Sequence, residues 1–232
     1  MYLTPRWAKR SQRQRDSSSF AFELDYFHPN DKGITPIPAQ WVKGTGNFVV
    51  VLGENASGKS FLRRIVSALA RKAEVEVMPI SMEGRGQEFG GLRGFVYGSE
   101  EWQSTGENSS HTVLTGISTC RSRATPHVIF WDEPDLGLSD GWAAGMGETF
   151  LEFAQDLPKM TCAAFVVTHS RALVERLVPA NPHYLYLGSD VAPPTLRAWL
   201  DKPVVARPLA TLKEESHQRF RLIDEILKTK KR

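Results

Sequence analysis

The residue run from Gly53 to Ser60 has the composition and spacing of a phosphate-binding loop. It reads G-E-N-A-S-G-K-S and matches the pattern G-x-x-x-x-G-K-[ST]. The glycines let backbone N–H groups curl around a phosphate, and the helix that follows adds the positive end of its dipole. Lys59 would reach the β- and γ-phosphates, and the Ser60 hydroxyl would bind Mg²⁺. The other residues expected to contact the nucleotide are Glu54, Asn55, Ala56, Ser57, Gly58 and Phe61.

A second candidate group stands where the apolar residues 128–131 end in two carboxylates, Asp132 and Glu133. The carboxyl ends of strands in a parallel sheet line the ligand crevice, so we expect both acids to face the phosphate loop. Asp132 would hold Mg²⁺ opposite Ser60. Glu133 would polarise the attacking water, as a general base or as the group that orients it. Taken alone, the segment also fits a solvated acidic turn after a buried strand.

A third candidate is His169, which follows the apolar residues 163–167 and Thr168. A lone histidine in such a place is more often a structural residue with its hydrogen bonds satisfied. Because it comes after the phosphate loop and the acidic pair in chain order, we interpret His169 as a sensor of the γ-phosphate.

The elements that must position these residues alternate along the chain. Apolar residues recur with helical spacing over residues 62–69 and 143–157, Ser170 can cap a helix that ends at residue 177, and an amphipathic helix is expected from Thr211 onward. Short apolar runs between them fit strands buried on both faces. This alternation predicts an α/β fold with a mostly parallel sheet and helices on both faces. The expected strands are residues 48–52, 75–80, 128–131, 163–167 and 183–187, with one short strand near 94–97 in the glycine-rich residues 84–106.

Length and composition limit the class of protein. The chain has 232 residues, 41% hydrophobic and 24% charged, which excludes wholesale disorder and suits either one large domain or one domain with appendages. No apolar stretch approaches the ~20 residues that cross a bilayer, so no membrane partner is expected. Two cysteines do not make a disulfide framework, which favours a reducing compartment, and we expect a cytoplasmic protein.

The charge is unevenly distributed. The net charge of +3 divides into +5 within residues 1–15, +4 within residues 228–232 and −6 between them. Basic ends of this kind can bind the phosphates of a nucleic acid or another anionic surface. Solvated ends that only aid solubility are an equally good interpretation.

Taken together, residues 46–190 resemble the ABC-type ATPases. The phosphate loop with its Asn and Ser looks like that of the class, D-E-P at 132–134 resembles its second acidic motif, and Thr168-His169 resembles its switch histidine. Q-S-T-G-E at 103–107 is similar to the signature motif in the Ser-x-Gly-Glu form of the SMC/RecF-like and OLD-like branch, rather than to the transporter form. The continuation D-L-G-L-S-D looks like the OLD-like pattern, with Ser139 and Asp140 in place of His-Pro.

The resemblance implies a P-loop NTPase fold that binds MgATP between two protomers, as a homodimer or an ATPase heteromer. Ser104 and the Gly106 N–H would then contact the γ-phosphate of the partner's nucleotide. The signature lies 47 residues after Lys59, so the helical subdomain of the class is expected to be reduced. No coiled-coil arms or nuclease module are expected. The predicted organisation is a basic arm (1–20), the ATPase domain (21–205) and a C-terminal amphipathic helix with a basic tail (206–232).

Three functions are compatible with these features. The favoured one is a soluble ATPase that acts as a dimeric switch on a nucleic acid or on a separate effector protein; by family analogy, such ATPases can serve in defence against phage. The second is a nucleotide-gated scaffold that regulates a toxin or nuclease partner with little turnover. The ATPase subunit of a membrane transporter is disfavoured by the signature form and the reduced subdomain.

Two roles that residues of the class normally fill have candidates in this sequence. Gln87 is the candidate for the glutamine that senses Mg²⁺, and Trp41 and Phe48 are the candidates for stacking on adenine, although core packing fits both aromatic residues better.

Overall fold

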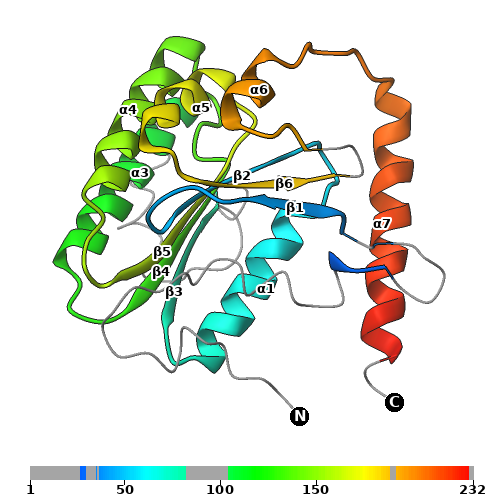
Figure 1. The fold of residues 1–232 in the computed structure, drawn as a ribbon, viewed down its shortest axis with the longest axis horizontal. Helices are drawn as coiled ribbons and strands as arrows, with labels where there is room; N and C mark the ends of the chain where they lie inside the picture. The colour runs from blue at the N-terminus through cyan, green and yellow to red at the C-terminus, as the bar shows by residue number, and fades with distance from the viewer. Residues whose placement is uncertain (1–26, 30–34, 36, 82–103, 189–191, 230–232) are drawn as a thin grey trace.

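The computed structural model describes residues 27–29, 35, 37–81, 104–188 and 192–229, and within them strands and helices alternate (Figure 1). The strands are β1 (Ala39–Val42), β2 (Phe48–Gly53), β3 (Glu76–Ser81), β4 (His127–Asp132), β5 (Thr161–Val167) and β6 (His183–Leu187). The helices are α1 (Lys59–Lys72), α3 (Thr105–Ser122), α4 (Asp140–Gln155), α5 (Arg171–Leu177), α6 (Leu196–Asp201) and α7 (Leu209–Thr229), with the 3-10 turn η5 (Val178–Ala180).

The strands form one six-stranded sheet in the order β1-β6-β2-β5-β4-β3. All neighbours pair in parallel except β1, which runs antiparallel to β6 at one edge. This confirms the predicted α/β class with a mostly parallel sheet. Because β2, β5 and β4 are adjacent and parallel, the segments that follow them emerge at the same edge of the sheet.

Both faces of the sheet are covered by helices, as predicted. Along β2, Phe48, Val50 and Leu52 belong to one buried cluster, and Val49 and Val51 belong to the other. Residues of α3, α4 and α5 complete the first cluster, and residues of α1 and α7 complete the second. Figure 1 shows α3, α4 and α5 on the left of the sheet and α1 and α7 on its right.

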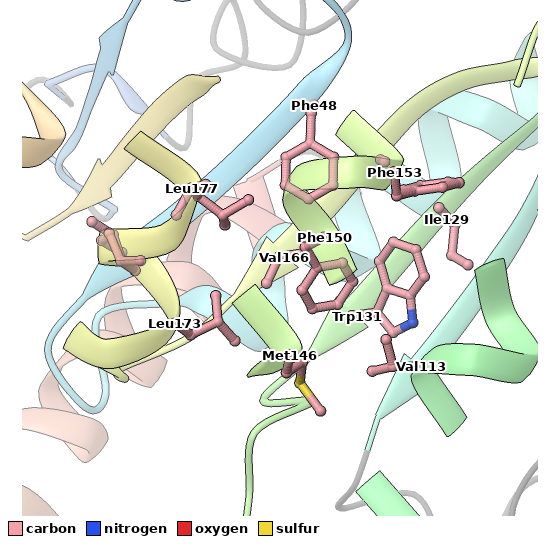
Figure 2. Close-up of a cluster of buried hydrophobic side chains, with 14 of the residues drawn as sticks. Phe48, Val113, Ile129, Trp131, Met146, Phe150, Phe153, Val166, Leu173 and Leu177 are labelled. Carbon is pink, nitrogen blue, oxygen red and sulfur yellow. The ribbon is translucent and has the colours of Figure 1, made fainter. Parts of the chain in front are cut away.

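Aromatic side chains pack behind the end of β4. The Trp131 ring lies 5.0 Å from Phe150 and 5.7 Å from Phe153, both edge-on, and Phe48 of β2 packs against the same two rings (Figure 2). Edge-to-face pairs of this kind add to the free energy gained by burying aromatic area. The packing fixes β4 against α4 at the residue immediately before Asp132, so the acidic pair follows a rigid support.

The predicted elements differ from the observed ones in a few places. All five strands expected outside residues 84–106 are present, with ends within two residues of those predicted. The prediction that each is buried on both faces is wrong for β3, because β3 is an edge strand and its first residue, Glu76, is exposed. β1 and α6 were not predicted, and no bounds were predicted for α3. The strand expected near 94–97 lies outside the described residues.

α7 is the predicted amphipathic C-terminal helix, and it begins two residues earlier than expected, at Leu209. Its Ile223 is buried in the cluster that also contains Leu62 and Ile65 of α1. Neither α7 nor any other helix among the described residues is both long enough and apolar enough to cross a membrane.

Candidate phosphate-binding site

The predicted phosphate loop is the tight connection between β2 and α1. Gly53 has φ +152°, Ala56 +59° and Gly58 +102°, so three backbone positions in this short loop adopt conformations that most side chains disfavour. A Cβ at Gly53 would lie 2.3 Å from the Leu187 carbonyl oxygen of β6. The first glycine is therefore required both by its own backbone angle and by the neighbouring strand.

The N-terminus of α1 carries neither a side-chain cap nor an acidic residue in its first turn. The first-turn N–H groups of a helix have no partner within the helix, and they bear the positive end of its dipole. An acidic cap would neutralise this partial charge. Without one, the N-terminus of α1 favours an anionic ligand.

Lys59 lies across the loop. Its Nζ donates hydrogen bonds to the carbonyl oxygens of Glu54, at 2.9 Å, and Gly53, at 3.3 Å, and the residue is 7% exposed. These bonds hold the ammonium group close to the loop backbone, next to the space that a phosphate would occupy.

Backbone hydrogen bonds tie the ends of three neighbouring strands together. The Glu133 N–H donates to the Val167 oxygen at 3.0 Å, and the Thr168 N–H donates to the Val51 oxygen at 3.3 Å. The first bond connects the end of β4 to β5, and the second connects the end of β5 to β2. The acidic pair, the segment containing His169 and the phosphate loop are consequently held in a fixed relation along one edge.

Glu133 is paired with His169. Its Oε1 lies 3.5 Å from His169 Nε2, a contact that is an ion pair only when the imidazole is protonated. The hydrogen bond from His169 is the main cause that lowers the pKa of Glu133, helped by the charges of His169 and Lys59 and opposed by burial. Glu133 is therefore a carboxylate at neutral pH, able to accept a hydrogen bond or a proton from water.

One pocket, with a volume of about 430 Å³, brings most of the predicted site residues together. This volume is in the range of small-molecule sites. Its walls contain three cations, Lys59, Arg64 and Arg219, and two acids, Asp132 and Glu133. The full lining consists of residues 55–61, Arg64, Asp132, Glu133, Ser216, Arg219, Phe220 and Ile223.

A magnesium ion fits the donors present. Among the described residues, no group of three or more His, Cys, Asp or Glu side chains could hold a metal ion by itself. Mg²⁺ does not require such a group, because it usually takes one or two protein oxygens together with water and substrate phosphates. The exposed Ser60 hydroxyl and the Asp132 carboxylate, which is 7% exposed, line the same pocket and offer such oxygens.

Ser104 and Gly106, by contrast, are not among the residues that line this pocket. Ser104 caps α3: its hydroxyl accepts from the Glu107 N–H, and the Glu107 carboxylate accepts from the Ser104 N–H. The backbone of Ser104 is the main cause that lowers the pKa of Glu107. Gly106 packs against Gly137 and Leu138, in the segment that follows the acidic motif.

The aromatic candidates for adenine are not in the pocket either. Phe48 is buried in the core, as its apolar context suggested, and the Trp41 ring lies 4.9 Å from the His183 ring beside β6. Gln87 lies outside the described residues. His169 does not line the pocket and adjoins it through Glu133.

The contribution of α7 to the pocket was not predicted: the helix supplies Ser216, Arg219, Phe220 and Ile223. The sequence of α7 shows an amphipathic pattern, which predicts that one face is buried but not which residues pack against it. No role was predicted for Asp135, whose pKa is raised by burial despite a hydrogen bond with Thr168.

Comparisons with known proteins add no family: no protein-family model matches the chain, and no curated protein matches it. Any function proposed for this site therefore depends on its own residues and geometry.

The glycine at the start of the loop gives a first prediction. We expect Gly53→Ala to lower the free energy of unfolding by about 1–3 kcal/mol, because the new Cβ would overlap the Leu187 carbonyl oxygen. The matched control is Gly145→Ala in α4, where an added Cβ meets nothing within 4 Å, and we expect it to stabilise by about 0.5–1 kcal/mol. Urea unfolding measures both. Equal stability of the Gly53→Ala protein and the unsubstituted protein would contradict the loop geometry.

The pair of Glu133 and His169 gives a second prediction. Because His169 lowers the pKa of folded Glu133, this carboxyl contributes stability above its unfolded pKa of about 4.3, and the contribution is lost as pH falls through the lower folded value. In His169→Ala, we expect the Glu133 pKa to rise and the loss of stability on acidification to become smaller. Carboxyl ¹³C NMR titration measures the pKa directly. His111→Ala, at an exposed histidine of α3, should leave it unchanged; an unshifted Glu133 in His169→Ala would disprove the pairing.

Proposed function

We propose that the chain is a magnesium-dependent ATPase of the ABC class, with a P-loop NTPase fold, that binds MgATP at residues 53–60 and hydrolyses it. The observation that carries the proposal is a single pocket lined by the loop between β2 and α1 and by the acidic pair at the end of β4. Both the order of these motifs and their meeting at one edge of the sheet support this class.

In this proposal the phosphates bind to the loop. The backbone N–H groups of residues 55–60, the N-terminus of α1 and the Lys59 ammonium supply positive charge on the side of the pocket formed by α1. Ser60 and Asp132 would hold Mg²⁺, which when bound neutralises charge that develops on the phosphate oxygens. The three cations of the lining exceed its two acids, which favours an anionic substrate.

Hydrolysis would be assisted by Glu133 and His169. A water oxygen attacks the γ-phosphorus while the bond from that phosphorus to the β–γ bridging oxygen breaks, giving ADP and inorganic phosphate. The Glu133 carboxylate orients this water and accepts its proton, as its lowered pKa permits at neutral pH. His169 holds Glu133 in place through the 3.5 Å contact and senses the γ-phosphate.

The position of the signature residues supports a shared site. Ser104 and Gly106 do not line their own chain's pocket, which fits the proposal that they contact the nucleotide of a second protomer. They are also coupled to the acidic motif: Ser109 of α3 donates a 2.7 Å hydrogen bond to the Leu136 oxygen, three residues after Glu133. A change at the γ-phosphate could thus be transmitted from Glu133 to the start of α3.

We propose that ATP-driven closing and hydrolysis-driven opening of such a dimer act as a switch in the cytoplasm on a nucleic acid or an effector protein. The charge of +5 within residues 1–15 and +4 within residues 228–232 supports an anionic partner. The alternative is a scaffold gated by nucleotide, which would bind ATP but hydrolyse it little or not at all.

Replacing the Glu133 carboxylate by an amide tests its proposed role in hydrolysis. Glu133→Gln should lower ATP hydrolysis by about 10²–10⁴-fold, the usual contribution of a positioned base, and leave ATP binding intact. Phosphate release and ATP titration measure the two effects. Glu148→Gln, at an exposed glutamate of α4, is the matched control and should hydrolyse ATP at the original rate. Unchanged hydrolysis in Glu133→Gln would refute the assigned role, and no measurable hydrolysis in the unsubstituted protein would favour the scaffold.

The shared site predicts assembly that depends on ATP. Light scattering of the Glu133→Gln protein should show a monomer without nucleotide and a dimer with MgATP. In that background, Ser104→Arg should prevent the dimer by placing a bulky side chain at the signature, whereas Ser110→Arg, at an exposed serine within α3, should not. A mass that stays constant while ATP is bound would contradict the shared site and point to a different ATPase subunit as the second half.

A further inference from the structure

The C-terminal helix forms part of the pocket that contains the phosphate loop. Residues 55–61 and Arg64 line the same cavity as Ser216, Arg219, Phe220 and Ile223 of α7, which lie about 160 positions later in the chain. Figure 1 shows α7 on the side of the sheet that α1 occupies. Whatever binds to the phosphate loop inside this cavity therefore lies next to α7.

Two contacts hold α7 in this position. Ile223 is 8% exposed and belongs to the buried cluster that includes Leu62 and Ile65 of α1. Arg207, just before α7, lies with Nη2 3.8 Å from the Glu54 Oε1 of the phosphate loop. Half-exposed ion pairs contribute little free energy, so the burial of Ile223 contributes more to holding α7 in this position.

Arg219 lines two cavities that border the phosphate loop. It lines the main pocket and also an adjoining cavity whose walls include Glu54, Asn55 and Ser57. The side chain is half-buried, and burial lowers the pKa of its guanidinium, although the nearby charge of Glu215 opposes this shift. Arginine stays protonated in proteins, so Arg219 can donate charge-assisted hydrogen bonds to an anion in the pocket.

Phe220 is the neighbouring residue and lines the main pocket with Phe61 and Arg64 of α1. It is 69% exposed, although α7 buries Ile223 only three residues later. An aromatic ring at a pocket wall with this much free surface offers a face on which a planar base can stack. Neither Trp41 nor Phe48 lines the pocket, so Phe220 takes the place that the sequence analysis left to them.

We infer that α7 completes the nucleotide pocket: Arg219 contacts the phosphates, and Phe220 contacts the base. The inference rests on the proposed function, since it concerns the same ligand. Two consecutive residues of α7 thus contact different parts of the ligand: Arg219, which lines both cavities that border the loop, takes the phosphates, and Phe220 takes the base.

The test uses two probes, MgATP and magnesium tripolyphosphate, the second of which has no base. Calorimetric titration of the full chain gives each affinity, and circular dichroism melting checks that each variant is folded. We expect Arg219→Ala to weaken both ligands by about tenfold or more. We expect Phe220→Ala to weaken MgATP by about 5- to 150-fold and to leave tripolyphosphate unchanged, because a lost base contact affects only the ligand with a base.

Two further variants serve as controls. Arg221→Ala removes an exposed arginine of α7 that lines none of the described pockets, and it should bind both probes normally. Phe220→Trp keeps an aromatic face and should retain the affinity for MgATP.

The outcomes separate this inference from the function on which it rests. If the unsubstituted protein binds MgATP, and Arg219→Ala and Phe220→Ala bind both probes equally well, α7 is only a neighbour of the site and the inference is wrong. If these variants bind more tightly, α7 obstructs the site, which also overturns it. If the unsubstituted protein binds neither probe, the proposed nucleotide site itself is refuted.

Discussion

The parallel pairing of β4, β5 and β2 is the constraint on which the rest of the site depends. It places the acidic pair, Thr168 with His169 and the phosphate loop at one edge, and the bonds from the Glu133 and Thr168 N–H groups continue the pairing beyond the strand ends. The side chains between the sheet and its helices make this edge rigid. Trp131, wedged against α4, is the clearest case, because it immediately precedes Asp132.

The pocket is built from both halves of the chain. β2 and α1 supply a loop suited to phosphates, and α7 returns from the C-terminal end to form another wall. If α7 contacts the bound nucleotide, binding would change the contacts of the helix that precedes the basic residues 228–232. The start of α3 is a second element connected to the site, because Gly106 and Ser109 contact residues 136–138, which follow the acidic pair. The site is thus connected to two other parts of the chain, α7 and the start of α3.

The sequence predicts those parts of the fold whose side-chain pattern is local. β2 and β6 were predicted from short runs of apolar and aromatic residues. The loop at residues 53–60 was predicted from its glycines and Lys59. α3 gives no clear apolar stripe, because its buried face includes Asn108, Ser109 and Thr112, whose polar groups partly bond to backbone, as Thr112 does to the Asn108 oxygen. The place of Arg219 and Phe220 beside the loop is set by long-range packing, which periodicity does not encode.

The central claim is that residues 53–60 bind the phosphates of MgATP, and calorimetric titration of three proteins tests it most directly. The unsubstituted chain should bind MgATP. Lys59→Ala should bind it at least tenfold more weakly, because a charged donor in the loop is lost. Lys72→Ala, which removes a lysine at the opposite end of the same helix, should bind it normally. Absence of binding to the unsubstituted chain, or equal affinity of all three proteins, would contradict the account.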